Sequence, residues 1–166
     1  MATDCLFRDD SYLKDCDATV VAIEPNGGIV LDRTVFYAAS GGQPGDRGAL
    51  TTATGDAILI EGASYTDAGK TEIAHLPAAT TGPRLKLGEP VHAMIDWELR
   101  YPRMRMHTAL HLLSAILPYP VTGGSVGEAE SRLDFDIPEG GLDKDAITAK
   151  LAEMIATGAA DRKSVV

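Results

Sequence analysis

The chain has 166 residues, enough for one domain of ordinary size or for two small ones. Hydrophobic residues make up 45% of it and charged residues 23%, a balance that is typical of folded globular proteins and argues against disorder. With 24 acidic against 15 basic residues the net charge is −9, so any nucleic acid has to be recognised by local shape rather than by diffuse attraction. The two cysteines, Cys5 and Cys16, exclude a disulfide-rich scaffold.

The hydrophobic residues occur in short runs. None of these runs approaches the ~18–20 apolar residues that span a bilayer, so we expect no membrane partner. The N-terminal segment is polar and acidic and lacks the basic and apolar regions of a secretory signal. We therefore expect a cytoplasmic location.

The first part of the chain is predicted to be rich in β-structure. Short runs with β-branched residues alternate there with turn residues, a pattern that is typical of a small barrel or sandwich. The predicted strands cover residues 18–23, 29–37, 47–51, 57–60, 72–76 and 91–95.

The pattern changes to α-β-α after this part. Residues 102–117 are predicted to form a helix, since Met106, Leu110, Leu113 and Leu117 fall on one face. A Gly-rich loop at 121–128, a strand at 131–137 and a second helix at 142–157 follow in the prediction. We therefore predict an α+β fold with a β-barrel domain at 1–95 and a second domain at 96–166. One strand cannot form a sheet alone, so the second domain is predicted to be incomplete, and the exposed strand edge suggests a homodimer.

Two histidines in the predicted first helix are candidate metal ligands. His107 and His111 are four residues apart, which places both imidazoles on one side of a helix and within reach of one ion. The alternative is a pair of histidines on a helix flank without a metal, because the pattern is short and names only two ligands. His75 and His92 lie in no such pattern, and we interpret them as ordinary residues of the barrel.

Two glycine-containing segments are candidate ligand-binding loops. Residues 34–46 read Thr-Val-Phe-Tyr-Ala-Ala-Ser-Gly-Gly-Gln-Pro-Gly-Asp, in which the glycines allow a close approach of the backbone and Gln43 offers donors and acceptors. The alternative is a β-bulge or a tight hairpin. The segment Thr122-Gly123-Gly124-Ser125 either presents amide groups to an anion or serves as a connector. Arg100, Arg103 and Arg105 at the start of the helix either contact phosphate or form a solvated helix face; the solvated face is favoured, and the helix dipole disfavours cations at this end.

These motifs together resemble one family. Residues 34–46 are similar to the Thr-x-Phe-Tyr…Gly-Gly-Gln-Pro-Gly-Asp segment of the editing region of alanyl-tRNA synthetase. Residues 96–113 resemble its Asp-Trp-x-x-Arg…His-Thr-Ala-x-His-Leu-Leu segment, and residues 122–136 resemble the block that follows. Because no aminoacylation domain precedes these motifs, the chain resembles the free-standing editing proteins of the AlaX group.

The resemblance implies a fold, an activity and a set of site residues. The implied fold is an N-terminal β-barrel followed by an α/β editing domain. The implied activity is hydrolysis of tRNA(Ala) that has been mischarged with serine, or in some members with glycine. His107 and His111 are then zinc ligands, Thr34 hydrogen-bonds the serine hydroxyl, and Gln43 with residues 122–125 lines the pocket. The three arginines are weaker candidates for contacts to tRNA phosphates.

The sequence also departs from the family pattern. The family completes its zinc site with a Cys-x-x-x-His pair, which the 166 residues do not contain. We therefore expect zinc to be absent or incompletely liganded in this chain, and we expect the chain to be truncated before that motif. The alternatives are a catalytically impaired fragment, a non-catalytic module that binds tRNA or a partner subunit, and an unrelated zinc hydrolase that uses the same histidines.

Overall fold

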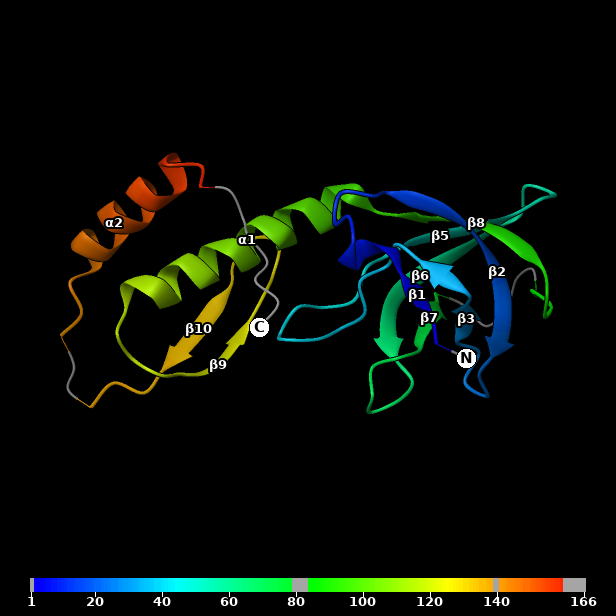
Figure 1. The fold of residues 1–166 in the computed structure, drawn as a ribbon, viewed down its shortest axis with the longest axis horizontal. Coiled ribbons are helices and arrows are strands. Elements are labelled where there is room, and N and C mark those ends of the chain that lie inside the picture. Colours follow the sequence, from blue (N-terminus) through cyan, green and yellow to red (C-terminus); the bar gives the residue numbers. More distant parts are fainter. Residues whose placement is uncertain (1, 79–83, 139–140, 160–166) are drawn as a thin grey trace. The chain divides into compact units, whose positions relative to one another are not determined.

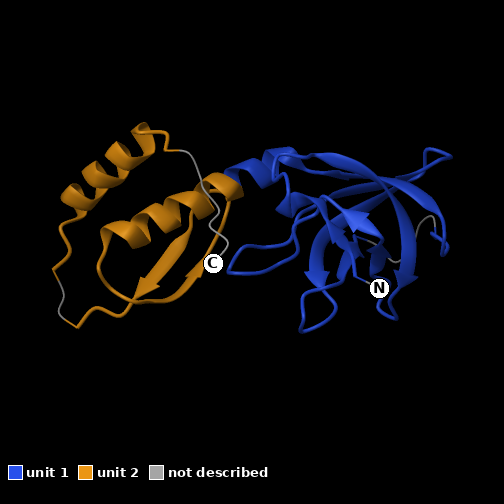
Figure 2. Cartoon of the chain, in the orientation of Figure 1, with its two compact units in different colours: residues 1–102 blue, residues 103–166 orange. Residues whose placement is uncertain are grey.

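The computed structural model describes residues 2–78, 84–138 and 141–159. The chain divides into two compact units, residues 1–102 and 103–166 (Figure 2). The division falls inside helix α1 (Trp97–Ile116), between Pro102 and Arg103, whereas the sequence pattern predicts a domain boundary between residues 95 and 96. Among the described residues, no helix is both long and apolar enough to cross a bilayer.

The first unit is built on a closed six-stranded barrel (Figure 1). Its strands lie in the order β2-β3-β7-β6-β5-β8, and all of the neighbouring pairs are antiparallel. This arrangement confirms the predicted α+β class with a small N-terminal barrel. The strands are β2 (Asp15–Ile23), β3 (Ile29–Leu31), β5 (Gly48–Thr52), β6 (Ala57–Tyr65), β7 (Ile73–Pro77) and β8 (Pro90–Ile95).

The barrel core follows from the alternation of side chains along each strand. In β8, Val91, Ala93 and Ile95 are buried, while the residues between them are exposed, as expected for a strand with one face on a core. The most completely buried large apolar side chains of the unit belong to Phe36, Leu31, Leu50, Ile73, Val20, Val30 and Val35.

The prediction of one continuous strand over residues 29–37 is wrong. The segment breaks into β3 and the short strand β4 (Arg33–Thr34), which pairs in parallel with β1 (Asp4–Cys5). Beyond β4 the amide groups of Phe36 and Tyr37 bond to side-chain oxygens instead of a neighbouring strand. Side-chain acceptors thereby replace the sheet partners that these amides would otherwise need.

Helix α1 begins five residues before the predicted start at Pro102. Asp96 caps its N-terminus, because its carboxylate accepts from the amide of Leu99 at 3.3 Å and its carbonyl accepts from Arg100 at 3.0 Å. Pro102 lies within the helix, where its missing N–H removes one backbone bond without ending the helix. The predicted start is therefore wrong, since this proline is not the first residue of the helix.

The second unit contains a pair of strands and a helix after α1. The predicted loop at 121–128 is wrong in its first half, since Val121–Ser125 forms strand β9, which pairs antiparallel with β10 (Arg132–Phe135). Gly124 allows the close pairing, because a Cβ there would lie 2.9 Å from the carbonyl oxygen of Arg132. Contrary to the prediction from the sequence pattern, strand β10 is therefore not alone but forms one edge of a two-stranded sheet. The homodimer expected from an exposed strand edge stays a prediction.

Helix α2 (Lys144–Ala156) confirms the second predicted helix. Asp143 caps it by accepting from the amide of Ala146 at 3.0 Å, and Gly158 follows its end with a positive φ of 56°. No residue of α2 is buried. Among the described residues of the second unit, the buried apolar side chains are those of Leu117 and Val126, so this unit has a thin core.

Candidate functional site

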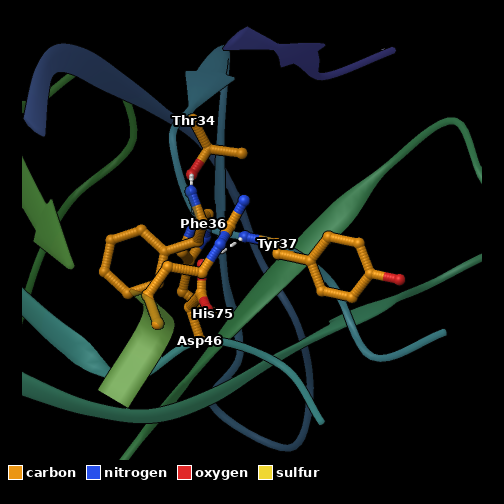
Figure 3. A network of polar contacts seen from close by, with 6 residues as sticks. Thr34, Phe36, Tyr37, Asp46 and His75 are labelled. Carbon is orange, nitrogen blue, oxygen red and sulfur yellow. Dashed lines mark hydrogen bonds and ion pairs between the residues drawn. The ribbon is translucent and has the colours of Figure 1, made fainter. Parts of the chain in front are cut away.

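A buried polar pair connects β4 with β7 inside the barrel (Figure 3). The hydroxyl of Thr34 lies 2.8 Å from Nε2 of His75, and both residues are fully buried. The same hydroxyl oxygen accepts from the amide of Phe36 at 3.0 Å. Nδ1 of His75 lies 2.9 Å from the carbonyl oxygen of Ile29.

These partners determine the tautomer of His75. A carbonyl oxygen only accepts, so Nδ1 of His75 carries the proton and donates to Ile29. Nε2 is therefore the acceptor for the hydroxyl proton of Thr34. Burial lowers the pKa of His75 to about 4, so the ring is neutral at neutral pH. Every polar atom of this pair has a partner, which is the condition for burying it without a large penalty.

We expect this histidine to make the stability of the barrel depend on pH. Histidine titrates at about pH 6.5 in an unfolded chain, whereas His75 titrates at about pH 4 in the fold. Between these two values the His75 ring binds a proton only in the unfolded chain. Acidification through this range therefore favours unfolding and is expected to lower the free energy of unfolding by about 3 kcal/mol. Urea denaturation followed by the fluorescence of Trp97 measures this loss.

The His75→Gln variant is the control for this experiment, since its stability is expected to lack the same step between pH 6.5 and 4. An NMR titration of the His75 ring provides a second measurement that does not depend on the variant's stability. A ring that becomes protonated near the ordinary histidine pKa would contradict the expectation.

A buried ion pair lies beside the Thr34–His75 pair, between α1 and the segment that precedes β5. The guanidinium of Arg100 donates to the carboxylate of Asp46, and the two residues are only 3% and 1% exposed. The same carboxylate oxygen accepts from the amide of Tyr37 at 2.8 Å (Figure 3). The guanidinium also lies over the Tyr37 ring, 5.5 Å from its centroid.

The Gly-rich motif forms a tight turn, which was one of the two sequence-based alternatives. Ser40 and Gln43 exchange both backbone hydrogen bonds, at 3.0 and 3.1 Å, across Gly41 and Gly42. The two glycines have φ values of 58° and 78°, a combination that glycine adopts without strain. Two residues further on, a Cβ at Gly45 would lie 2.1 Å from the carbonyl oxygen of Ala63, so only glycine fits against β6.

Two of the residues that are predicted to bind the substrate therefore lie within the first unit. Thr34 is fully buried and its hydroxyl already donates to His75, while Gln43 is 5% exposed. A hydroxyl has one proton and two lone pairs, so the oxygen of Thr34 retains one acceptor position besides its bond to Phe36. The assignment of Thr34 and Gln43 to substrate binding stays a prediction.

The histidine pair lies on α1 in the second unit. The His107 and His111 rings stack with centroids 5.0 Å apart and planes inclined by 12°, so both lie on the same side of the helix. Burial, and secondarily the neighbouring His111, lower the pKa of His107, which keeps its ring neutral and able to bind a metal at neutral pH.

The donor set fits half of a zinc site. Two side-by-side imidazoles match the ligand type and spacing that zinc takes from one helix. Among the described residues, however, no group of three or more His, Cys, Asp or Glu side chains is placed to hold an ion. The histidines therefore supply two ligands, and the rest of a coordination sphere has to come from water, substrate or another source of protein ligands.

The structure overturns both interpretations of two helix arginines. Arg100 and Arg103 are buried and pair with Asp46 and Glu128, so they neither form a solvated face nor lie open to phosphate. The predicted pocket residues of the second unit, Thr122, Gly123, Gly124 and Ser125, lie in strand β9. Their predicted position beside the barrel turn joins the two units and stays a prediction.

Sequence reasoning missed His75 and Asp46, which organise the polar interior of the barrel. His75 stands between the apolar residues Ala74 and Leu76 in the sequence. This apolar surrounding was the available signal of a buried histidine whose ring nitrogens have hydrogen-bond partners inside the protein. Asp46 closes the Gly-Gly-Gln-Pro-Gly-Asp motif, but its partner Arg100 is 54 residues away in the sequence. No local pattern connects residues so far apart.

Comparisons with known proteins assign the chain to a family. Residues 11–99 match the model of the class II (A) tRNA synthetases. The chain is 38% identical over 160 residues to alanyl-tRNA editing protein AlaX-M of Methanosarcina mazei, covering 92% of this chain and 63% of that protein. It is 36% identical over 155 residues to AlaX-M of Methanosarcina barkeri, covering 90% and 63% of the two chains. The chain belongs to the class II (A) tRNA synthetase family, and AlaX alanyl-tRNA editing proteins are among its relatives.

The match to other members of the AlaX family is shorter. The chain is 40% identical over 115 residues to AlaX-L of Pyrococcus horikoshii, which covers 68% of this chain and 27% of that protein. The chain spans less than two thirds of the length of its AlaX-M relatives, 63% in the two Methanosarcina proteins. The family assignment confirms the resemblance that the three sequence motifs indicated.

Proposed function

We propose that this chain takes part in trans-editing, the hydrolysis of the aminoacyl ester of tRNA(Ala) that carries the wrong amino acid. The observation that carries the proposal is the stacked His107–His111 pair, found on the helix where the family motif predicts metal ligands. The names of the AlaX relatives, which describe alanyl-tRNA editing, support the substrate class. We propose serine as the amino acid that is removed, with glycine as the second candidate.

We propose that His107 and His111 hold zinc in this reaction. When bound, zinc orients the ester, polarises its carbonyl or lowers the pKa of a water molecule. The imidazole of His107 is suited to this role, because burial lowers its pKa and protons then compete less with the metal. With two protein ligands among the described residues, we expect weaker zinc affinity than at a site of three or four.

Selectivity for serine is assigned to Thr34 together with Gln43 and residues 122–125. The free acceptor position on the Thr34 oxygen can take the proton of a serine hydroxyl. A site built around such a bond discriminates against alanine, which lacks the hydroxyl. Because Thr34 is fully buried, the substrate has to reach it through a rearrangement of the surrounding side chains.

A second candidate function is a non-catalytic module that binds tRNA or a partner subunit. The observation in its favour is the two-ligand donor set among the described residues, which is too small for a firmly held zinc. A catalytically impaired chain of the same family predicts the same metal content. The module and the impaired chain differ from the proposed hydrolase because neither of them hydrolyses the aminoacyl ester.

The test is the release of labelled serine from Ser-tRNA(Ala) by the zinc-loaded chain, with Gly-tRNA(Ala) and Ala-tRNA(Ala) for comparison. We expect serine to be released and alanine to be retained, and we expect a chelator to abolish the release. His107→Ala and His111→Ala are each expected to lower the rate at least ~100-fold, the size of effect seen when support for a catalytic metal is lost.

His92→Ala is the matched control, because His92 is an exposed histidine on β8 that pairs with Asp17 in the first unit. Its rate should equal that of the parent chain. If the zinc-loaded chain releases no serine or glycine and still binds tRNA(Ala), the hydrolase proposal is wrong and the module is the better description.

A further inference from the structure

Two cations gather around the Tyr65 ring in the first unit. Nη2 of Arg8, from the 3-10 helix η1 (Leu6–Arg8), lies 3.3 Å from the Tyr65 hydroxyl and 3.4 Å from the carbonyl oxygen of Lys70. Nζ of Lys70 lies 5.7 Å from the centroid of the same ring and donates to the hydroxyl of Ser40 at 2.8 Å. The pair therefore lies beside the tight turn of the Gly-rich motif.

The turn that carries Lys70 is built to hold this residue in place. Lys70 has a φ of 55°, and it is the one non-glycine residue with positive φ in the described chain. The carboxylate of Asp67 accepts from the amides of Thr71 and Glu72 at 2.9 and 3.0 Å, which fixes the loop between β6 and β7. Backbone strain of this kind at an exposed lysine is typical of functional positions.

The charges of Arg8 and Lys70 are not neutralised within the described part of the chain, where neither forms an ion pair with a carboxylate. The nearby carboxylate of Asp67 is directed to backbone amides. Two like charges near one ring repel each other, and an anion bound between them would relieve that repulsion. In a chain of net charge −9, such a local cationic site has a sign opposite to that of the molecule as a whole.

We propose that Arg8 and Lys70 bind a backbone phosphate of the RNA substrate next to the Ser40–Gln43 turn. A guanidinium and an ammonium that both lie near the Tyr65 ring supply the donors that a phosphodiester accepts. The turn is open at Gly41, because no heavy atom lies within 4 Å of the position that a Cβ would take there. This site rests on the proposed function, which makes tRNA(Ala) the phosphodiester that the chain meets.

The test measures the affinity of uncharged tRNA(Ala) for the full chain at several salt concentrations. The variants are Arg8→Gln and Lys70→Asn, of which the second keeps a residue that tolerates positive φ. The control is Lys86→Gln, which removes one exposed positive charge elsewhere in the same unit. All three variants change the net charge by the same amount.

We expect Arg8→Gln and Lys70→Asn each to weaken tRNA binding about tenfold at low salt and to reduce the slope of log affinity against log salt by roughly 0.7–0.9, as for one lost phosphate contact. Lys86→Gln should match the parent chain in both. Thermal unfolding of each variant should match the parent as well, which separates lost binding from lost structure.

Equal affinity and slope for the Arg8, Lys70 and Lys86 variants would overturn this site while leaving the editing proposal intact. A loss of affinity with an unchanged slope would also overturn it, since it would mean that no phosphate contact was removed. Absence of tRNA binding by the parent chain at low salt would overturn the site too, and the serine-release assay would then judge the editing proposal separately.

Discussion

Replacing Asp46 with asparagine is expected to lower the free energy of unfolding of the barrel by about 3–5 kcal/mol, the cost of leaving one member of a buried ion pair without its partner. Asparagine has nearly the same shape and can still accept from the amide of Tyr37, so the change removes charge more than contact. Arg100 would remain buried and positively charged without a carboxylate. Urea denaturation followed by Trp97 fluorescence reports on this unit, because Trp97 packs against the barrel core.

The matched control is Asp17→Asn, the same substitution in an exposed pair of the same unit. Asp17 lies 2.8 Å from the His92 ring with its side chain largely exposed, and exposed pairs contribute only ~0–1 kcal/mol. Arg100→Met combined with Asp46→Asn completes a double-mutant cycle. We expect the double variant to lose less free energy of unfolding than the two single variants lose together. Additive losses, or equal effects of Asp46→Asn and Asp17→Asn, would show that the ion pair is not coupled.

Replacing Gly45 with alanine is expected to destabilise the barrel by about 3 kcal/mol or more, because overpacking against a rigid backbone forces strands to move. The new Cβ would lie 2.1 Å from the oxygen, 2.6 Å from the nitrogen and 2.9 Å from the carbonyl carbon of Ala63. All three atoms belong to the backbone of β6, so no side-chain rotation relieves the overlap. The same denaturation measurement applies.

Gly62→Ala provides the comparison within the same strand as Ala63. The nearest atom to a Cβ at Gly62 is Cδ1 of Leu76 at 4.0 Å, an ordinary contact with a flexible side chain. We expect this variant to remain within ~1 kcal/mol of the parent chain. If Gly45→Ala were as stable as Gly62→Ala, the close approach of the Gly-rich motif to β6 would be wrong.

Asp46→Asn and Gly45→Ala both test how the Gly-rich motif is held in the barrel. Asp46 fixes the end of the motif to α1 through Arg100. Gly45, the residue before Asp46, packs against the backbone of β6. Thr34 fixes the start of the motif to β7 through His75. The turn between these anchors, with Gly41 and Gly42, is thereby held by a rigid frame, which the proposed role of Gln43 in substrate binding would need.

Features that depend on local periodicity could be predicted from the amino-acid sequence. Short β-branched runs between turn residues predicted where the six barrel strands lie, although β3 ends at Leu31 instead of residue 37 and β6 continues to Tyr65 instead of ending at residue 60. The helical period predicted α2, and the four-residue spacing of His107 and His111 placed both rings on one side of α1. The three motif segments were also sufficient to indicate the family.

Contacts between residues that are distant in the sequence became visible only in the folded chain. Thr34 and His75 are 41 residues apart, and Asp46 and Arg100 are 54 residues apart, so nothing in the local sequence connects them. Strand β9 was missed because glycines disfavour strands unless a partner approaches closely, and that partner, β10, is visible only in the fold. The periodicity of a segment indicates which of its faces is buried. Pairing between segments depends on the closure of the barrel and on the packing of the first turn of α1 against it, and no single segment of the sequence encodes either of these.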